Sequence, residues 1–303
     1  MPAPGPPGKA PKAMLKTATR PGSRSAVTTV SDDEFRKFCD LIYRRTGMSY
    51  GETKRYFVDH RLLERVAQTE SPSVQSYLSL LRFDTTGREL ELIVNALTVN
   101  ETYFWREEHQ FACLTRSILP DILARKRRGD RLRIWSLPCS TGEEPYSIAL
   151  WLLENWPEVD HWDVEILASD IDTRVLEAAR AGIFDARSVQ RLSHSVLGRY
   201  FTRLPDDRWQ ILDALRGSIE FSRVNVSDRD QMAGFRDVDV IFCRNMLIYF
   251  DDVSRREAAE AMFSCLTPGG YVCLGHSESM SRISSLFDVR RFDDAIVYQR
   301  PFR

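Results

Sequence analysis

The segment WSLPCSTGEEPYS, residues 135–147, decides the fold, because it runs from an apolar stretch through a tight turn into the start of a helix. Nucleotide-binding α/β folds begin in this way. Phosphate-binding versions of the turn are rich in glycine and carry a lysine. This turn has one glycine and two adjacent acids, Glu143 and Glu144. It therefore predicts a nucleotide-type site whose ligand carries positive charge.

Further β-type runs follow at 164–169, 219–224, 238–243 and 271–275, after a first run at 132–137. Helical stretches at 144–155, 173–182 and 253–266 separate most of them, which indicates a doubly wound, mostly parallel sheet. Two last runs, 287–292 and 295–299, are so close together that they predict an antiparallel hairpin at the sheet edge. Five parallel strands closed by such a hairpin are typical of the class I methyltransferase fold, which uses S-adenosylmethionine (SAM).

The chain divides into three parts that differ in composition and in predicted secondary structure. Residues 1–29 are basic and rich in Pro, Gly, Ser and Thr, and predict a disordered tail that is either solvated or an electrostatic tether. Residues 30–106 predict a helical domain and linker, with Ser31 and Glu34 forming a capping box. Residues 107–303 form the predicted catalytic domain. It opens with a helix over about 108–127 and contains a small β insertion, a β-subdomain, at about 195–218.

Composition excludes several classes of protein. With 303 residues, 43% of them hydrophobic, and a net charge of −1, the chain has no overall field that favours nucleic acid or membrane surfaces. Its six cysteines form no CxxC pair and predict buried free thiols. The longest apolar run is too short to span a bilayer and no secretory signal is visible, so we expect a cytoplasmic monomer without a metal site.

The acidic loop favours SAM over other nucleotides. The chain contains neither G-x-G-x-x-G nor a Walker A motif. Two glutamates at contact distance would repel a phosphate by several kcal/mol at low effective dielectric, so we expect a nucleoside with cationic groups. Alternatively, Glu143 and Glu144 only stabilise a helix N-terminus through its dipole.

Polar residues directly after other strands support a nucleoside site. Asp170 is placed to bind ribose hydroxyls; alternatively it caps the next helix, a role for which Asp172 is better placed. The pair Asn225–Val226 is suited to an adenine edge and face. The pair Arg244–Asn245, followed by Tyr249, lies at the mouth of the same site.

Four separated motifs, TVNETYFWRE (98–107), STGEEPYSIA (140–149), ASDID (168–172) and CRNMLIYF (243–250), resemble those of the CheR family, the chemotaxis receptor glutamate methyltransferases. The resemblance covers about residues 31–303. It implies SAM-dependent methyl esterification of glutamates on a receptor's cytoplasmic helical bundle. The SAM contacts that it implies are Asn100, Thr102, Arg106, Glu143, Asp170, Asn225, Val226, Arg244 and Asn245.

A carboxylate acceptor is already ionised at neutral pH, so the chemistry needs alignment rather than a general base. Arg106 and Tyr249 are the candidate catalytic residues that orient this carboxylate, although Tyr249 could instead pack against the adenosine. His276 follows the fifth strand, and we expect a structural role for it.

The helical domain offers a second candidate surface. Lys54, Arg61 and Arg65 share one predicted helix face with Arg55 beside them, and this face either docks acidic receptor helices or is simply solvated. Some family members also bind a C-terminal receptor pentapeptide through a glycine-bearing loop of the β-subdomain. The corresponding stretch here, RLPDDRWQ (203–210), has no glycine, so we expect no dependence on such a tether.

Two other hypotheses remain open at this point. One is a non-catalytic sensor of SAM or S-adenosylhomocysteine (SAH) that signals through the helical domain. The other is a methyltransferase acting on small molecules or nucleic acid, which would share the cofactor site. The complete NETYFWR and CRNMLIYF motifs favour a catalytic protein over the sensor.

Overall fold

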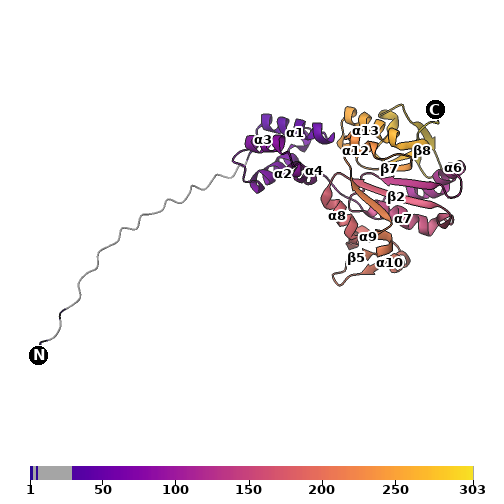
Figure 1. Cartoon of the computed structure of the whole chain (residues 1–303), viewed down its shortest axis with the longest axis horizontal. Helices are drawn as coiled ribbons and strands as arrows, with labels where there is room; N and C mark the ends of the chain where they lie inside the picture. The colour runs from indigo at the N-terminus through magenta and orange to yellow at the C-terminus, as the bar shows by residue number, and fades with distance from the viewer. Residues whose placement is uncertain (3–4, 6–28, 303) are drawn as a thin grey trace.

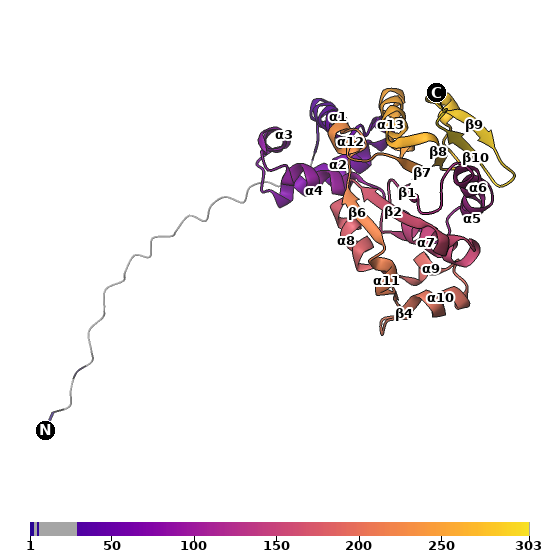
Figure 2. The ribbon, with the colours of Figure 1, turned by 45° about the vertical axis from the view of Figure 1, so that its right-hand side comes forward.

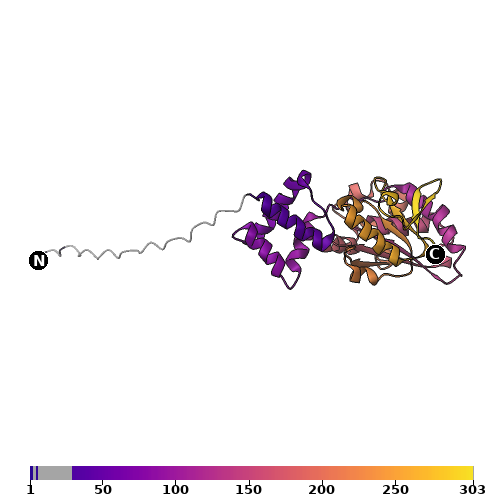
Figure 3. The ribbon, with the colours of Figure 1, turned by 90° about the horizontal axis from the view of Figure 1, so that it is seen from above.

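The computed structural model describes residues 1–2, 5 and 29–302. The tail predicted over residues 1–29 therefore lies almost entirely outside the described residues. The N-terminal domain contains α1 (Asp32–Thr46), η1 (Glu52–Lys54), α2 (Arg55–Gln68), α3 (Val74–Phe83) and α4 (Arg88–Leu97). Figure 1 shows these helices as a separate unit beside the sheet domain, and Figure 3 shows the two units lying side by side.

The capping box at the start of α1 is confirmed. Ser31 Oγ accepts a hydrogen bond from the Glu34 N–H at 3.3 Å, and the Glu34 carboxylate accepts one from the Ser31 N–H at 3.0 Å. The helix ends at Gly47, whose φ of 74° is readily adopted by glycine. This turn directs the following residues toward the sheet domain.

The main sheet has seven strands in the order β6-β2-β1-β7-β8-β10-β9. The strands are β1 (Arg131–Ser136), β2 (Asp163–Asp170), β6 (Ile219–Arg223), β7 (Val238–Cys243), β8 (Leu266–Leu274), β9 (Asp288–Arg291) and β10 (Ile296–Gln299). The first five are parallel, and β10 pairs antiparallel with both β8 and β9. The predicted parallel sheet with a final antiparallel hairpin is confirmed (Figure 2).

Helices cover both faces of this sheet, as the alternation within β1 requires. Ile134 packs into a core with α7 (Glu143–Asn155), whereas its neighbour Trp135 packs into the other core with α13 (Asp252–Cys265). The second core also contains apolar side chains of α1 to α4. The helical domain is therefore joined to one face of the sheet by shared packing. Other helices of the sheet domain are α8 (Thr173–Ala181), α12 (Arg229–Ala233), η3 (Val159–His161) and η5 (Met280–Arg282).

The helix predicted over 108–127 is shorter and less regular than expected. It consists of α5 (Glu108–Cys113), a π-helical turn η2 (Leu114–Ile118) and α6 (Leu119–Leu123). Beyond it, the Arg127 N–H donates to the Asp130 carboxylate at 2.8 Å, and Gly129 has a φ of 91°. These two features form a turn between the end of α6 at Leu123 and the start of β1 at Arg131.

The predicted β insertion is a three-stranded sheet in the order β3-β5-β4. Its strands are β3 (Ile183–Phe184), β4 (Phe201–Arg203) and β5 (Trp209–Ile211), with α9 (Ala186–Val189), α10 (His194–Tyr200) and α11 (Asp213–Arg216) around them. Strand β3 precedes the expected start near residue 195, because the chain enters this small sheet directly after α8. Figure 1 shows the unit below the main sheet.

The predicted free thiols are confirmed, since all six cysteines are unpaired and five of them are buried. Among residues 29–302, the helices are too short or too polar to cross a membrane.

Candidate active site

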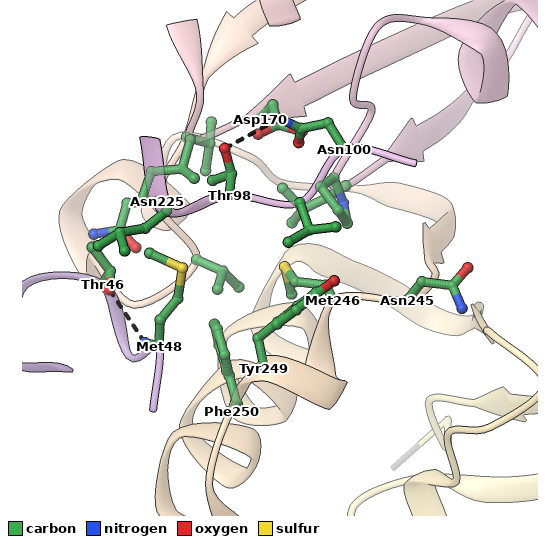
Figure 4. Close-up of a pocket in the computed structure, with 17 residues that line it drawn as sticks. Thr46, Met48, Thr98, Asn100, Asp170, Asn225, Asn245, Met246, Tyr249 and Phe250 are labelled. Carbon is green, nitrogen blue, oxygen red and sulfur yellow. Dashed lines mark hydrogen bonds between the residues drawn. The ribbon is translucent and has the colours of Figure 1, made fainter. Parts of the chain in front are cut away.

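Two adjoining hollows lie at the carboxyl ends of β1, β2 and β7. The first is mainly apolar and is drawn in Figure 4; the second is polar. The residues that line both hollows are Val99, Asn100, Pro138, Asp170, Asn245 and Tyr249. These shared walls make one continuous site, which suits a ligand with an apolar ring at one end and charged groups at the other.

The helical domain contributes to the apolar hollow, which sequence analysis missed. Thr46, the last residue of α1, and Met48, two residues beyond it, line this hollow (Figure 4). Met48 forms an isolated β-bridge with Phe250, and the Ser49 N–H donates to the Tyr249 carbonyl at 2.9 Å. Only tertiary packing brings this turn to the site, and its sequence carries no recognisable motif.

Asp170 lies at the end of β2 and lines both hollows, as its predicted role requires. Its carboxylate accepts hydrogen bonds from the Ser140 N–H at 2.9 Å and the Asp172 N–H at 3.0 Å. Burial raises the pKa of this carboxyl to about 6, although the backbone donors oppose the shift. The group is thus held in a fixed orientation and is ionised at neutral pH.

Asp172 caps α8, as predicted, and also fixes the interdomain linker. Its carboxylate accepts from the Arg174 N–H at 2.9 Å, from Thr98 Oγ1 at 2.6 Å and from Asn100 Nδ2 at 3.0 Å. One buried carboxylate therefore holds both a helix start and the segment that carries Asn100 into the site.

The two glutamates of the first loop point in different directions. Glu143 lines neither hollow: its carboxylate accepts hydrogen bonds from Thr141 Oγ1 and Ser188 Oγ, both at 2.6 Å. Glu144 lines the polar hollow instead and accepts from Ser136 Oγ at 2.8 Å. Adjacent residues at a helix start project about 100° apart, so only one of them can face the ligand.

Gly142 explains why this loop keeps a single glycine. Its φ is 99°, and a Cβ atom there would lie 3.0 Å from the Ala179 Cβ and 3.0 Å from the Tyr146 ring. Glycine is required here because α7 lies close to α8. Its presence is therefore not evidence of a phosphate-binding loop.

Arg244 is a buried cation at the floor of the polar hollow. Its guanidinium lies 2.9 Å from the Glu144 carboxylate and 3.2 Å from that of Glu107, and it donates to the Arg106 carbonyl at 2.6 Å. Burial raises the pKa of Glu144, whereas the charge of Arg244 opposes this shift. The pair locks the strand end, the first loop and the linker together.

The two candidate catalytic residues line the same hollow. Arg106 and Tyr249 both border the polar hollow together with Thr102. Tyr249 belongs to η4 (Leu247–Tyr249) and also borders the apolar hollow, where Figure 4 shows its ring beside Met246. Burial raises the pKa of Tyr249 and the nearby charge of Arg106 lowers it, so the phenol stays protonated at neutral pH.

The other predicted contacts lie around this site. Asn225 and Val226 line the apolar hollow, and Asn225 Nδ2 donates to the Arg45 carbonyl at 2.7 Å across the domain boundary. Asn245 lines both hollows with a φ of 61°, and its N–H donates to Glu278 at 2.8 Å. His276 lines neither hollow; its Nδ1 lies 2.7 Å from Glu107, consistent with the expected structural role.

Comparison with known proteins identifies the family. Residues 33–98 match the family model described as "CheR methyltransferase, all-alpha domain", and residues 100–296 match "CheR methyltransferase, SAM binding domain". This chain belongs to the CheR methyltransferase family. It is 50% identical to "Chemotaxis protein methyltransferase 2" of Vibrio cholerae over 90% of this chain and 95% of that protein. It is 37% identical to the "Chemotaxis protein methyltransferase" of Salmonella typhimurium over 86% of this chain and 88% of that protein.

The site of this CheR protein fits SAM. Three acids, Glu101, Glu144 and Asp170, border the hollows, and no lysine of residues 29–302 lines either one. An adenosine ring suits the apolar walls, and cationic groups suit the polar hollow, whereas a phosphate would meet the acids. When bound, SAM supplies a methyl group that its sulfonium activates for transfer.

The predicted basic face of the CheR all-alpha domain is largely neutralised. Arg65 forms a buried pair with Glu89 at 2.6 Å, which ties α2 to α4, and its side chain is only 13% exposed. Arg55 lies 2.6 Å from Asp32, and Arg61 lies 2.9 Å from Glu64. The four basic residues therefore do not form one free cationic surface. Among them, Lys54 is exposed and makes no ion pair within residues 29–302.

Proposed function

We propose that this enzyme methylates glutamate side chains on the cytoplasmic helical bundle of a chemotaxis receptor, and that Arg106 and Tyr249 orient the acceptor carboxylate. The observation that carries this proposal is that both side chains border the polar hollow beside the linker. A guanidinium and a protonated phenol are donors that suit a carboxylate. The relatives are named chemotaxis protein methyltransferases, which supports this acceptor.

The absence of a suitable base supports a carboxylate acceptor over an amine or an alcohol. Within residues 29–302, the acids at the polar hollow are Glu101, Glu144 and Asp170. Glu101 is paired with Arg187, Glu144 is paired with Arg244, and Asp170 is bonded to two backbone N–H groups. Burial raises the pKa of the Cys139 thiol well above its usual value. A glutamate acceptor needs no proton removed, because it is ionised at neutral pH.

The cofactor contacts follow from the same geometry. Asp170 would bind the ribose hydroxyls, and the pair Asn225–Val226 would hold the adenine. Glu144 and Arg244 would face the amino-acid end of the cofactor, since they line the polar hollow. Asn100, Thr102 and Asn245 border this hollow as well. Glu143 would act indirectly, by holding the first loop through Ser188.

Receptor docking would use the helical domain without a tether on the β-subdomain. Lys54 and Arg61 are the members of the basic face whose charges lie nearest to solvent. The turn between β4 and β5 is closed on itself, because the Leu204 N–H donates to the Arg208 carbonyl at 2.8 Å and Arg203 pairs with Asp207 at 2.7 Å. This closed turn supports independence from a receptor pentapeptide.

The test begins with isothermal titration of the purified protein with SAH. Labelled methyl transfer to receptor cytoplasmic fragments, prepared with and without a C-terminal pentapeptide, follows. Base-labile label with equal kcat/KM for both fragments would support the full proposal. SAH binding without transfer to any of several fragments would favour a sensor instead, and label on nucleic acid or metabolites would identify another acceptor class.

A further inference from the structure

Another surface hollow, distinct from the apolar and polar hollows, adjoins the active site. We call it the arginine groove, and its relevant residues are Ile248, Asp252, Arg255, Arg256, Glu278 and Arg282. Ile248 also lines the polar hollow, so one side chain forms the wall between groove and active site. An acceptor segment that enters the polar hollow over Ile248 would lie against this groove.

The floor of the arginine groove is held rigidly. The Glu278 carboxylate accepts hydrogen bonds from the Asn245 N–H at 2.8 Å and the Gly275 N–H at 2.9 Å. Arg255 Nε donates to the Leu247 carbonyl at 2.9 Å. These bonds tie the loop after β8 and the start of α13 to η4. The groove is thus built from the same elements that position Tyr249.

The groove carries three arginines, Arg255, Arg256 and Arg282, but only two acids, Asp252 and Glu278, so positive charge is in excess. Asp252 lies 3.3 Å from Arg255, and Glu278 is occupied by backbone donors. Arg256 and Arg282 are exposed, and within residues 29–302 neither forms an ion pair with an acid. Two such cations facing one hollow attract an anionic group.

An apolar contact lies beside these cations. Ile248, which lines the groove, is 46% exposed, and Val253, next in sequence to the groove residue Asp252, is 49% exposed. Large apolar side chains next to arginines at a concave surface are typical of protein recognition sites. A partner with one acidic and one apolar side chain on the same face would match the groove.

We infer that the arginine groove binds an acidic side chain of the acceptor helix, about one turn away from the glutamate that is methylated. This inference rests on the proposed function. Residues three or four apart on a helix are separated by roughly 5–6 Å. One residue, Ile248, lines both the polar hollow and the groove, so neighbouring side chains of one helix could enter each. The groove would thereby select glutamates that have an acidic neighbour, with Arg256 and Arg282 as specificity-determining residues.

The test compares methyl transfer by the full-length enzyme and three variants, using a receptor cytoplasmic fragment that the wild-type enzyme methylates. Arg256→Glu, Arg282→Glu and the double variant should lower kcat/KM for the fragment, by roughly tenfold in the double variant, with the loss mainly in KM. Their SAH affinity should equal that of the wild type, which also shows that they fold. Arg128→Glu is the matched control, because this exposed residue precedes β1 at the opposite end of the strands.

The acceptor supplies the second arm. Replacing acidic residues three or four positions from the methylated glutamate by glutamine should lower kcat/KM for the wild-type enzyme but not further for the double variant. Equal kcat/KM for the double variant and the Arg128→Glu control would overturn the groove assignment while leaving the proposed function intact. If the wild-type enzyme methylates no receptor fragment, the proposed function fails and the groove assignment fails with it.

Discussion

Replacing Arg244 by methionine should destabilise the protein strongly, because the substitution leaves Glu144 buried without its countercharge. The guanidinium contacts Glu144 at 2.9 Å, Glu107 at 3.2 Å and the Arg106 carbonyl at 2.6 Å. Removing one partner from a buried ion pair costs about 3–5 kcal/mol, since the other charge remains desolvated. The free energy of unfolding should therefore fall by about 4 kcal/mol at neutral pH.

The loss should depend on pH in a defined direction. Burial raises the pKa of Glu144 and the charge of Arg244 opposes that shift, so removing the arginine should raise the pKa further. The folded variant then binds a proton at Glu144 that the unfolded chain has already released. Its free energy of unfolding consequently decreases as pH rises, and the difference from the wild type should shrink toward acidic pH.

Chemical denaturation at several pH values measures both effects. Arg116→Met serves as the control, since this arginine is 71% exposed and pairs with Asp294 at 3.4 Å, and its loss should cost less than about 1 kcal/mol. The variant Glu144→Gln in the Arg244→Met background should recover part of the lost stability. Two results would refute the argument. One is an equal loss of unfolding free energy in Arg244→Met and Arg116→Met, and the other is additive losses from Arg244→Met and Glu144→Gln.

Three further predictions concern the roles of single groups. Asp170→Asn should weaken SAH binding at least tenfold. The wild type should lose SAH affinity below about pH 6, where this carboxyl protonates, and the variant should not; titration at pH 5 and pH 8 tests both points. Arg106→Ala should lower kcat for the receptor more than it lowers SAH affinity, and equal losses in both would assign Arg106 to the cofactor alone. Arg61→Glu should raise the receptor KM without affecting stability, whereas Arg65→Glu should lower the melting temperature because it breaks the buried pair with Glu89.

Strand and helix patterns were readable from the sequence because they depend on local periodicity. The five apolar runs and the terminal hairpin correspond to β1, β2, β6, β7, β8, β9 and β10. The capping roles of Ser31 and Asp172 were also predicted, since a cap depends on residues two or three positions away. The helix over 108–127 was predicted too long, because the weak helical pattern does not mark the end of α6 at Leu123.

Tertiary contacts decided the direction and the charge state of the site residues. The sequence alone identified an acidic first loop, but only the packing of Ser188 against that loop turned Glu143 away and left Glu144 to face the hollow. The basic spacing on α2 was visible as well, yet Glu89, from a distant helix, neutralises Arg65.

Local patterns in this chain thus determined the helices and strands, the mostly parallel sheet with its terminal hairpin, and the strand ends that carry the predicted site residues. They could do so because periodicity, capping and the chemistry of a loop act over a few residues. Only the folded chain decided that Thr46 and Met48 would border the apolar hollow and that Ile248 would lie between the polar hollow and the arginine groove. Those outcomes depend on which residues, far apart in sequence, pack together and exclude water. Such long-range packing cannot be predicted from a short segment of sequence.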